Sequence, residues 1–185
     1  MNCGEWLRTT PKGVRCVWLL FILWICGVNY MDDSLLGKKA EAKIKEWLDR
    51  PQDGYCFDRI PDQMTGFYGS KNICDFTLYI YPNKYYIESK ATWQDRFDFS
   101  MLTEKQHTGL TEKSKIYGVY GVVIVLFATY KRAIVIDIRE INRLIQSGRK
   151  SINIKTMDRI GLQYHEIETI PSRKELLDYT GGFQL

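Results

Sequence analysis

The sequence has few of the residues that build soft metal sites or disulfide frameworks. Its 185 residues include five cysteines and two histidines, and no two cysteines stand in Cys-x-x-Cys spacing. This argues against a zinc site of the finger or ribbon type and against a full disulfide framework. We therefore expect free thiols in a reducing compartment and a cytoplasmic protein.

Long hydrophobic runs are also missing. The longest run, residues 16–28, is thirteen residues long, whereas a helix that spans a bilayer needs about 20 apolar residues. No clear small-x-small cleavage site follows it, as a signal peptide would require. We interpret residues 1–30 as an upstream extension, with translation starting at Met31, because Asp32, Asp33 and Ser34 supply helix-capping chemistry. A weak membrane anchor is the alternative.

The remaining residues, 31–185, have the length of one α/β or α+β domain. No repeat or low-complexity tract is present. The net charge of +4 and the sequence pI of about 8.7 are compatible with a polyanionic partner without requiring one. The composition therefore permits nucleic acid as a partner. We do not expect the protein to bind a membrane.

A predicted strand over residues 85–89 carries the strongest functional signal. Its aromatic and β-branched residues favour a strand, and the period of two places Tyr86, Glu88 and Lys90 on one face. Residues 76–80 predict the preceding strand. If Pro82 and Asn83 form the loop between them, Asp75 lies across from Lys90 and diagonal to Glu88.

Two carboxylates and a lysine converging on one hairpin suggest metal-assisted phosphodiester hydrolysis. Mg²⁺ is typically held by one or two carboxylates together with waters and substrate phosphates. A lysine there can orient water or offset charge that develops on the phosphate. The alternative is an ordinary ion pair between Glu88 and Lys90 on an exposed hairpin face.

Helical periodicity places two further polar residues beside buried positions. Residues 34–49 predict an amphipathic helix with Glu41 at the edge of its buried stripe, where a glutamate should have a partner and a simple pair with Lys45 is one interpretation. Residues 100–117 predict a second helix in which Gln106 either turns inward or lies at the helix edge, with one stripe formed by Leu102, Gln106, Leu110, Lys113 and Tyr117. Residues 55–74 are expected to be rich in loops, with Arg59 and Lys71 available to contact phosphate.

The order of these residues resembles the PD-(D/E)xK nuclease superfamily and, more closely, the RecU-like Holliday junction resolvases of bacteria and phages. The resemblance covers most of residues 37–138. It runs through residues 37–41, 59–62, 75–76, 87–92, 97–106 and 121–124. It implies an α/β fold with a restriction-endonuclease-like core, in which helices flank a central mixed β-sheet of about four to five strands.

The resemblance also implies a function. Glu41, Asp75, Glu88 and Lys90 would be catalytic, with Asp75, Glu88 and the Ser89 carbonyl holding Mg²⁺ or, alternatively, Mn²⁺. Arg59, Lys71 and Gln106 would contact DNA. The protein would then be a homodimeric endonuclease acting on four-way junctions in recombination and repair. A restriction-type or repair nuclease and a non-catalytic DNA-binding protein are the alternatives.

Overall fold

The structure, a computed structural model, describes residues 33–49, 54–61, 72–171, 177–180 and 183. The helices are α3 (Asp33–Leu48), α4 (Glu104–Lys113) and α5 (Ile138–Gln146), with short 3-10 helices at Phe99–Met101, Ala128–Tyr130 and Asp158–Ile160. The strands are β1 (Tyr55–Arg59), β2 (Phe76–Ile80), β3 (Asn83–Thr92), β4 (Arg96–Asp98), β5 (Val119–Phe127), β6 (Arg132–Asp137), β7 (Ser151–Asn153), β8 (His165–Glu166), β9 (Thr169–Pro171) and β10 (Leu177–Tyr179).

A mixed sheet of six strands, in the order β1-β2-β3-β5-β6-β8, forms the centre of the fold. Strands β3 and β5 are parallel, and every other neighbouring pair is antiparallel. The parallel pair requires a crossover connection, which contains α4. This architecture confirms the expected α/β fold with a central mixed sheet flanked by helices. The expected number of four to five strands was too low, because the short edge strands β1 and β8 extend the sheet.

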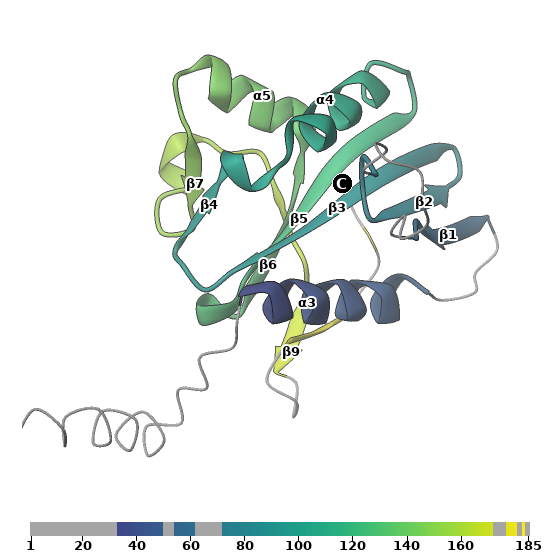
Figure 1. Ribbon diagram of the computed structural model, residues 1–185, viewed down its shortest axis with the longest axis horizontal. Coiled ribbons are helices and arrows are strands. Elements are labelled where there is room, and N and C mark those ends of the chain that lie inside the picture. The colour runs from purple at the N-terminus through teal and green to yellow at the C-terminus, as the bar shows by residue number, and fades with distance from the viewer. Residues whose placement is uncertain (1–32, 50–53, 62–71, 172–176, 181–182, 184–185) are drawn as a thin grey trace, which may run out of the picture. The chain divides into compact units, whose positions relative to one another are not determined.

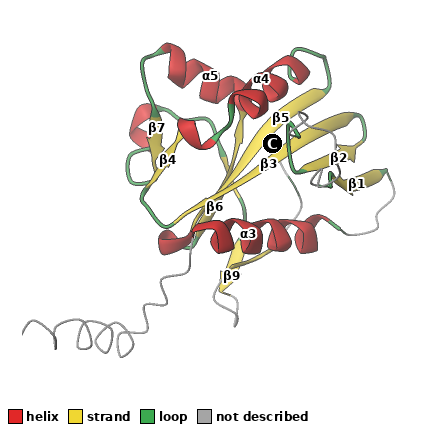
Figure 2. Cartoon of the chain, in the orientation of Figure 1, coloured by secondary structure: helices red, strands yellow, loops and turns green. Residues whose placement is uncertain are grey.

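Helices cover both faces of the sheet (Figures 1 and 2). Helix α3 lies on one face, where its buried residues join a core cluster with Leu78 and Ile87. They are the residues of the predicted apolar stripe: Leu36, Ala40, Ile44, Trp47 and Leu48. Helices α4 and α5 lie on the other face, where Leu110 and Ile141 pack with alternate residues of β5 and β6. Residues of β3 therefore point to two different helical layers.

Strand β1 corrects the expectation that residues 55–74 are rich in loops at the first five of these residues, whereas residues 62–71 lie outside the described residues. It pairs antiparallel with β2 along its whole length, from Tyr55 opposite Ile80 to Arg59 opposite Phe76. The Phe57 ring stacks on the Phe76 ring with centroids 5.5 Å apart. Cys56 and Asp58, which alternate with the packed residues, are exposed. An edge strand with such polar residues has a weak signature in the sequence.

Helix α4 is shorter than the predicted helix over residues 100–117. A capping box formed by Thr103 and Gln106 sets its start, since both residues satisfy backbone amides of the first turn. The helix ends at Lys113, and Tyr117 is exposed rather than part of the buried stripe. The predicted stripe is therefore wrong at its last position.

The apolar run of residues 16–28 and the expected start at Met31 lie outside the described residues. Within the part of the chain that the structure describes, no helix is both long enough and apolar enough to cross a membrane.

Candidate active site

The hairpin formed by β2 and β3 brings Asp75 beside Glu88. Phe76 pairs with Ile87 and Ile80 pairs with Asn83, so Tyr81 and Pro82 form the turn. Asn83 already belongs to β3. The expectation that Asp75 faces Lys90 was therefore wrong by two residues of β3. The corrected register places the two carboxylates closer together, on the same face of the hairpin.

Hydrogen bonds to β3 fix the position of Asp75. Its backbone N–H donates to the Ile87 carbonyl at 3.0 Å, and its Oδ2 accepts from the Ser89 N–H at 2.8 Å. The Asp75 carbonyl in turn accepts from the Ile60 N–H, just after β1, at 2.8 Å. Two neighbouring segments, β3 and the residue after β1, thus hold Asp75 in place.

Glu88 is 1% exposed, which contradicts the alternative of an ordinary surface ion pair. Its Oε1 accepts from the Lys90 ammonium at 2.7 Å and from the Gln106 amide nitrogen at 2.6 Å. Lys90 also lies 3.4 Å from the Gln106 amide oxygen. Glu88, Lys90 and Gln106 therefore form one partly buried polar cluster between β3 and α4.

The surroundings of Glu88 disfavour its ionised form. Burial and, after it, the neighbouring Asp75 carboxylate raise the pKa of Glu88 to about 8, although the charge of Lys90 and its hydrogen bond act in the opposite direction. Its second oxygen, Oε2, is buried and has no hydrogen-bond partner within the described part of the chain. An unpartnered buried carboxylate oxygen is costly unless a cation or a proton satisfies it.

Gln106 connects this cluster to the start of α4. Its side-chain oxygen accepts from the Thr103 N–H at 3.0 Å, and its own N–H donates to the Thr103 hydroxyl at 3.3 Å. The side-chain nitrogen remains available and donates to Glu88. The amide therefore faces the acids, as one of the two interpretations of this position expected.

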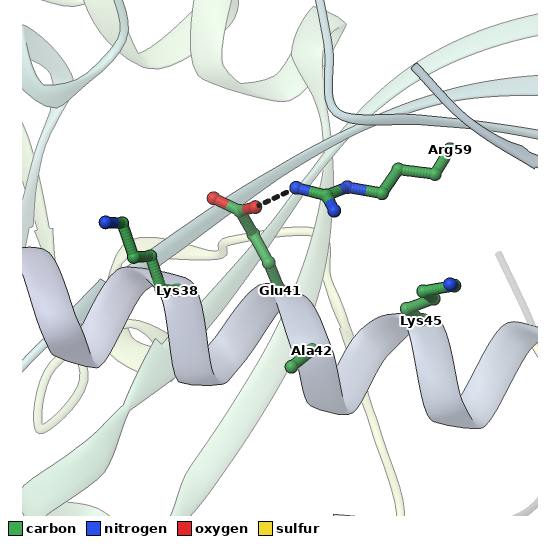
Figure 3. A pocket seen from close by; sticks show the side chains of 5 residues that line it. All are labelled: Lys38, Glu41, Ala42, Lys45 and Arg59. Carbon is green, nitrogen blue, oxygen red and sulfur yellow. Dashed lines mark hydrogen bonds and ion pairs between the residues drawn. The ribbon is translucent and has the colours of Figure 1, made fainter. Parts of the chain in front are cut away.

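Glu41 lies in a pocket of about 370 Å³ that is lined by Lys38, Glu41, Ala42, Lys45 and Arg59 (Figure 3). Its carboxylate forms an ion pair with Arg59, with 3.4 Å between Oε2 and the guanidinium. Lys45, the alternative partner, points away from Glu41 in Figure 3. The Glu41 charge contributes to the raised pKa of Glu88. Glu41 thus forms an ion pair with Arg59 of β1, and its negative charge also disfavours ionisation of Glu88.

The carboxylates fit a hard divalent cation of the magnesium type. Within the described ranges, no group of three or more His, Cys, Asp or Glu side chains is arranged to hold a metal ion. Magnesium needs only one or two carboxylates, because waters and substrate phosphates complete its shell. Asp75 and Glu88, with the unpartnered Oε2, supply such a pair.

The structure brings most of the expected site residues together on and around β3. Asp75, Glu88, Ser89, Lys90 and Gln106 are linked by the contacts above, and Glu41 and Arg59 form the adjoining pair. Lys71 lies outside the described residues. Lys38 and Lys45 were not predicted as site residues. Their spacing of three and four residues from Glu41 was the signal that could have identified them.

Comparisons with known proteins identify one family and several similar solved structures. The family described as Recombination protein U matches residues 58–183. No protein with a curated description matches the chain. One of the solved structures that match is that of Archaeoglobus fulgidus Hjc, described as a Holliday junction resolvase from an archaeal hyperthermophile. The match has 15% identity and a TM-score of 0.41 and covers 56% of this chain and 78% of that one.

Proposed function

Because the chain belongs to the Recombination protein U family, we propose that it is a metal-dependent endonuclease that hydrolyses phosphodiester bonds in branched DNA and resolves four-way junctions. The observation that carries the proposal is the buried carboxylate of Glu88. It lies beside Asp75, is held by a lysine and an amide, and has one oxygen without a hydrogen-bond partner among the described residues. The restriction-endonuclease-like core expected from the sequence agrees with the mixed sheet and with the family.

Asp75 and Glu88 are the proposed metal ligands, together with the Ser89 carbonyl. A bound Mg²⁺ or Mn²⁺ would supply Lewis acidity at the phosphate. The two carboxylates attract the cation, and the cation offsets the burial and the charge of Asp75 that otherwise make ionisation of Glu88 unfavourable. Loading the site is therefore coupled to loss of the Glu88 proton.

Lys90 and Gln106 are proposed to orient and stabilise the reacting groups. The Lys90 ammonium, with 18% of its side chain exposed, faces the acids from a partly buried position. The positive charge of the ammonium can stabilise the negative charge that develops on the phosphate. Gln106 fixes the Glu88 carboxylate through a hydrogen bond of 2.6 Å and would contact the DNA from the N-terminus of α4.

Glu41 is the proposed helix acid beside the carboxylate pair, and Arg59 and Lys71 are proposed phosphate contacts. Arg59 ends β1 next to Phe76, which places its side chain between Glu41 and the strand that follows Asp75. This position would let Arg59 neutralise a DNA phosphate close to the reacting bond.

The proposed functional unit is a homodimer in the cytoplasm. One site cuts one strand, whereas resolving a four-way junction requires two symmetric cuts. A two-fold dimer supplies two sites in the required relation. The dimer is thus a consequence of the proposed reaction.

The test is incubation of the protein with four-way, flap and linear DNA, with and without Mg²⁺. We expect metal-dependent cleavage with preference for the four-way junction. Asp75→Asn and Glu88→Gln should each abolish cleavage while retaining DNA binding, because each removes a charge that the metal needs. Wild-type turnover by either variant would refute the site, and cleavage without junction preference would favour a restriction-type or repair nuclease.

A further inference from the structure

The pocket on α3, called here the α3 pocket and lined by Lys38, Glu41, Ala42, Lys45 and Arg59, contains three positive side chains and one negative side chain. Building on the proposed function, we propose that the α3 pocket binds two DNA backbone phosphates that flank the cleaved one, with one contact each from Lys38 and Lys45. Neither lysine belongs to the proposed catalytic set. The inference therefore adds a substrate subsite to the enzyme.

The geometry of α3 places the two lysines on either side of the helix acid. Positions 38, 41 and 45 are three, four and seven residues apart and so lie on one helix face. Seven residues of helix span about 10 Å. One DNA strand carries a phosphate about every 3.4 Å along the duplex axis, so this span covers more than one phosphate.

Lys38 and Lys45 form no ion pair that would stabilise the fold within the described part of the chain. No ion pair between Lys38 or Lys45 and another described residue is present, and both are exposed. Lys43 of the same helix behaves differently, since its ammonium pairs with Glu46 at 3.0 Å and with Asp178 of β10. Positive charge is thus left without a partner on the face that lines the pocket, where a phosphate would neutralise it.

The α3 pocket adjoins the acids of the active site. Arg59, which lines the pocket, pairs with Phe76 in the sheet, and the next residue, Ile60, donates a hydrogen bond to the Asp75 carbonyl. The ion pair between Arg59 and Glu41 joins side chains that are 48% and 30% exposed. Such an exposed pair stabilises weakly, so Arg59 can exchange the Glu41 carboxylate for an incoming phosphate.

The test measures how salt affects binding to a labelled four-way junction in EDTA, over about 50 to 200 mM salt. Each lost phosphate contact lowers the slope of log affinity against log salt by about one. We expect this decrease for Lys38→Ala and for Lys45→Ala, and twice the decrease for the double variant. The double Lys→Arg variant should keep the wild-type slope. Lys150→Ala is the matched control, because it removes one exposed charge between α5 and β7 and should not change the slope.

A second arm replaces the two phosphates next to the cut by neutral methylphosphonates. We expect this replacement to weaken binding by the double alanine variant less than binding by the wild type, because the variant keeps Arg59 as a phosphate contact in the pocket. A double-variant slope equal to that of Lys150→Ala, or equal weakening of both proteins by methylphosphonate, would overturn the subsite. A wild-type protein that cuts junctions but gives these results would refute only the subsite, whereas one that neither binds nor cuts DNA would refute the proposed function.

Discussion

The buried acid Glu88 should make the stability of the metal-free protein depend on pH in an unusual direction. Burial, followed by the charge of Asp75, raises the pKa of Glu88 in the folded protein from 4.5 to about 8. Between these two values the folded state holds a proton that the unfolded state has released. The free energy of unfolding must therefore fall as the pH rises through this window. The contribution is fully present below the unfolded pKa and is lost once the folded pKa is passed.

The size of the effect follows from the shift. One pKa unit corresponds to about 1.36 kcal/mol, so the window from pH 4.5 to about 8 represents on the order of 5 kcal/mol. Glu88→Gln replaces the acid by a neutral side chain of similar shape and removes this dependence. In EDTA the variant should be more stable than the wild type at pH 9, and the two should converge near pH 4.5.

Urea unfolding at pH 5, 7 and 9 in EDTA measures the effect. Glu140→Gln is the matched control of opposite sign, because the hydrogen bond from Arg143 lowers the pKa of Glu140. Its ionised form is the stabilising one, so this variant should lose stability at neutral pH and approach the wild type as the pH falls. Mg²⁺ should stabilise the wild type most at high pH, by about 2.7 kcal/mol at one hundred times its dissociation constant, and should leave Glu88→Gln unchanged. Identical pH profiles for the wild type and Glu88→Gln in EDTA would refute the reasoning.

Three further predictions concern single features of the chain. Lys90→Ala should lower the cleavage rate about 100-fold or more and keep the stabilisation by Mg²⁺, whereas a decrease below about threefold would show that Lys90 does not serve the reaction. Gln106→Glu keeps an oxygen for the Thr103 N–H but loses the donor to Glu88. Helix content measured by circular dichroism should persist, while the free energy of unfolding should fall by about 1.5–3 kcal/mol. Cleavage at the wild-type rate would contradict the proposed role of Gln106. A protein that starts at Met31 should cut DNA and unfold like the full chain, since the sheet and its three described helices all follow that residue. Poor solubility of this shorter protein, or partitioning of the full chain into membranes, would instead support a membrane anchor in residues 1–30.

Local periodicity predicted the parts of the site that lie within one element. The period of two in a strand placed Glu88 and Lys90 on one face, and the helical period predicted the buried stripe of α3. Both follow from backbone geometry alone, so neighbouring residues decide them. The structure confirms these expectations.

Features that depend on two elements could not be obtained in this way. The register of the hairpin depended on whether Asn83 belongs to the turn or to β3, and a shift of one turn position moves the residue opposite Asp75 by two. Strand β1 was missed because pairing with β2, rather than its own residues, stabilises it. The hydrogen bond from Gln106 to Glu88 joins residues that are 18 positions apart, and no local pattern encodes it.

The contact between Gly109 and Ile73 has a consequence for how the site withstands changing conditions. A Cβ atom on Gly109 would lie 2.5 Å from the Ile73 side chain, so only glycine allows α4 to approach the segment that leads into Asp75. Gly109 follows Gln106 by one helical turn, and Ile73 precedes Asp75 by two residues. Steric contact, which neither salt nor pH screens, therefore aligns the amide with the acid. The spacing of these two groups should persist at ionic strengths that release DNA, so the enzyme would lose its substrate before it loses its geometry.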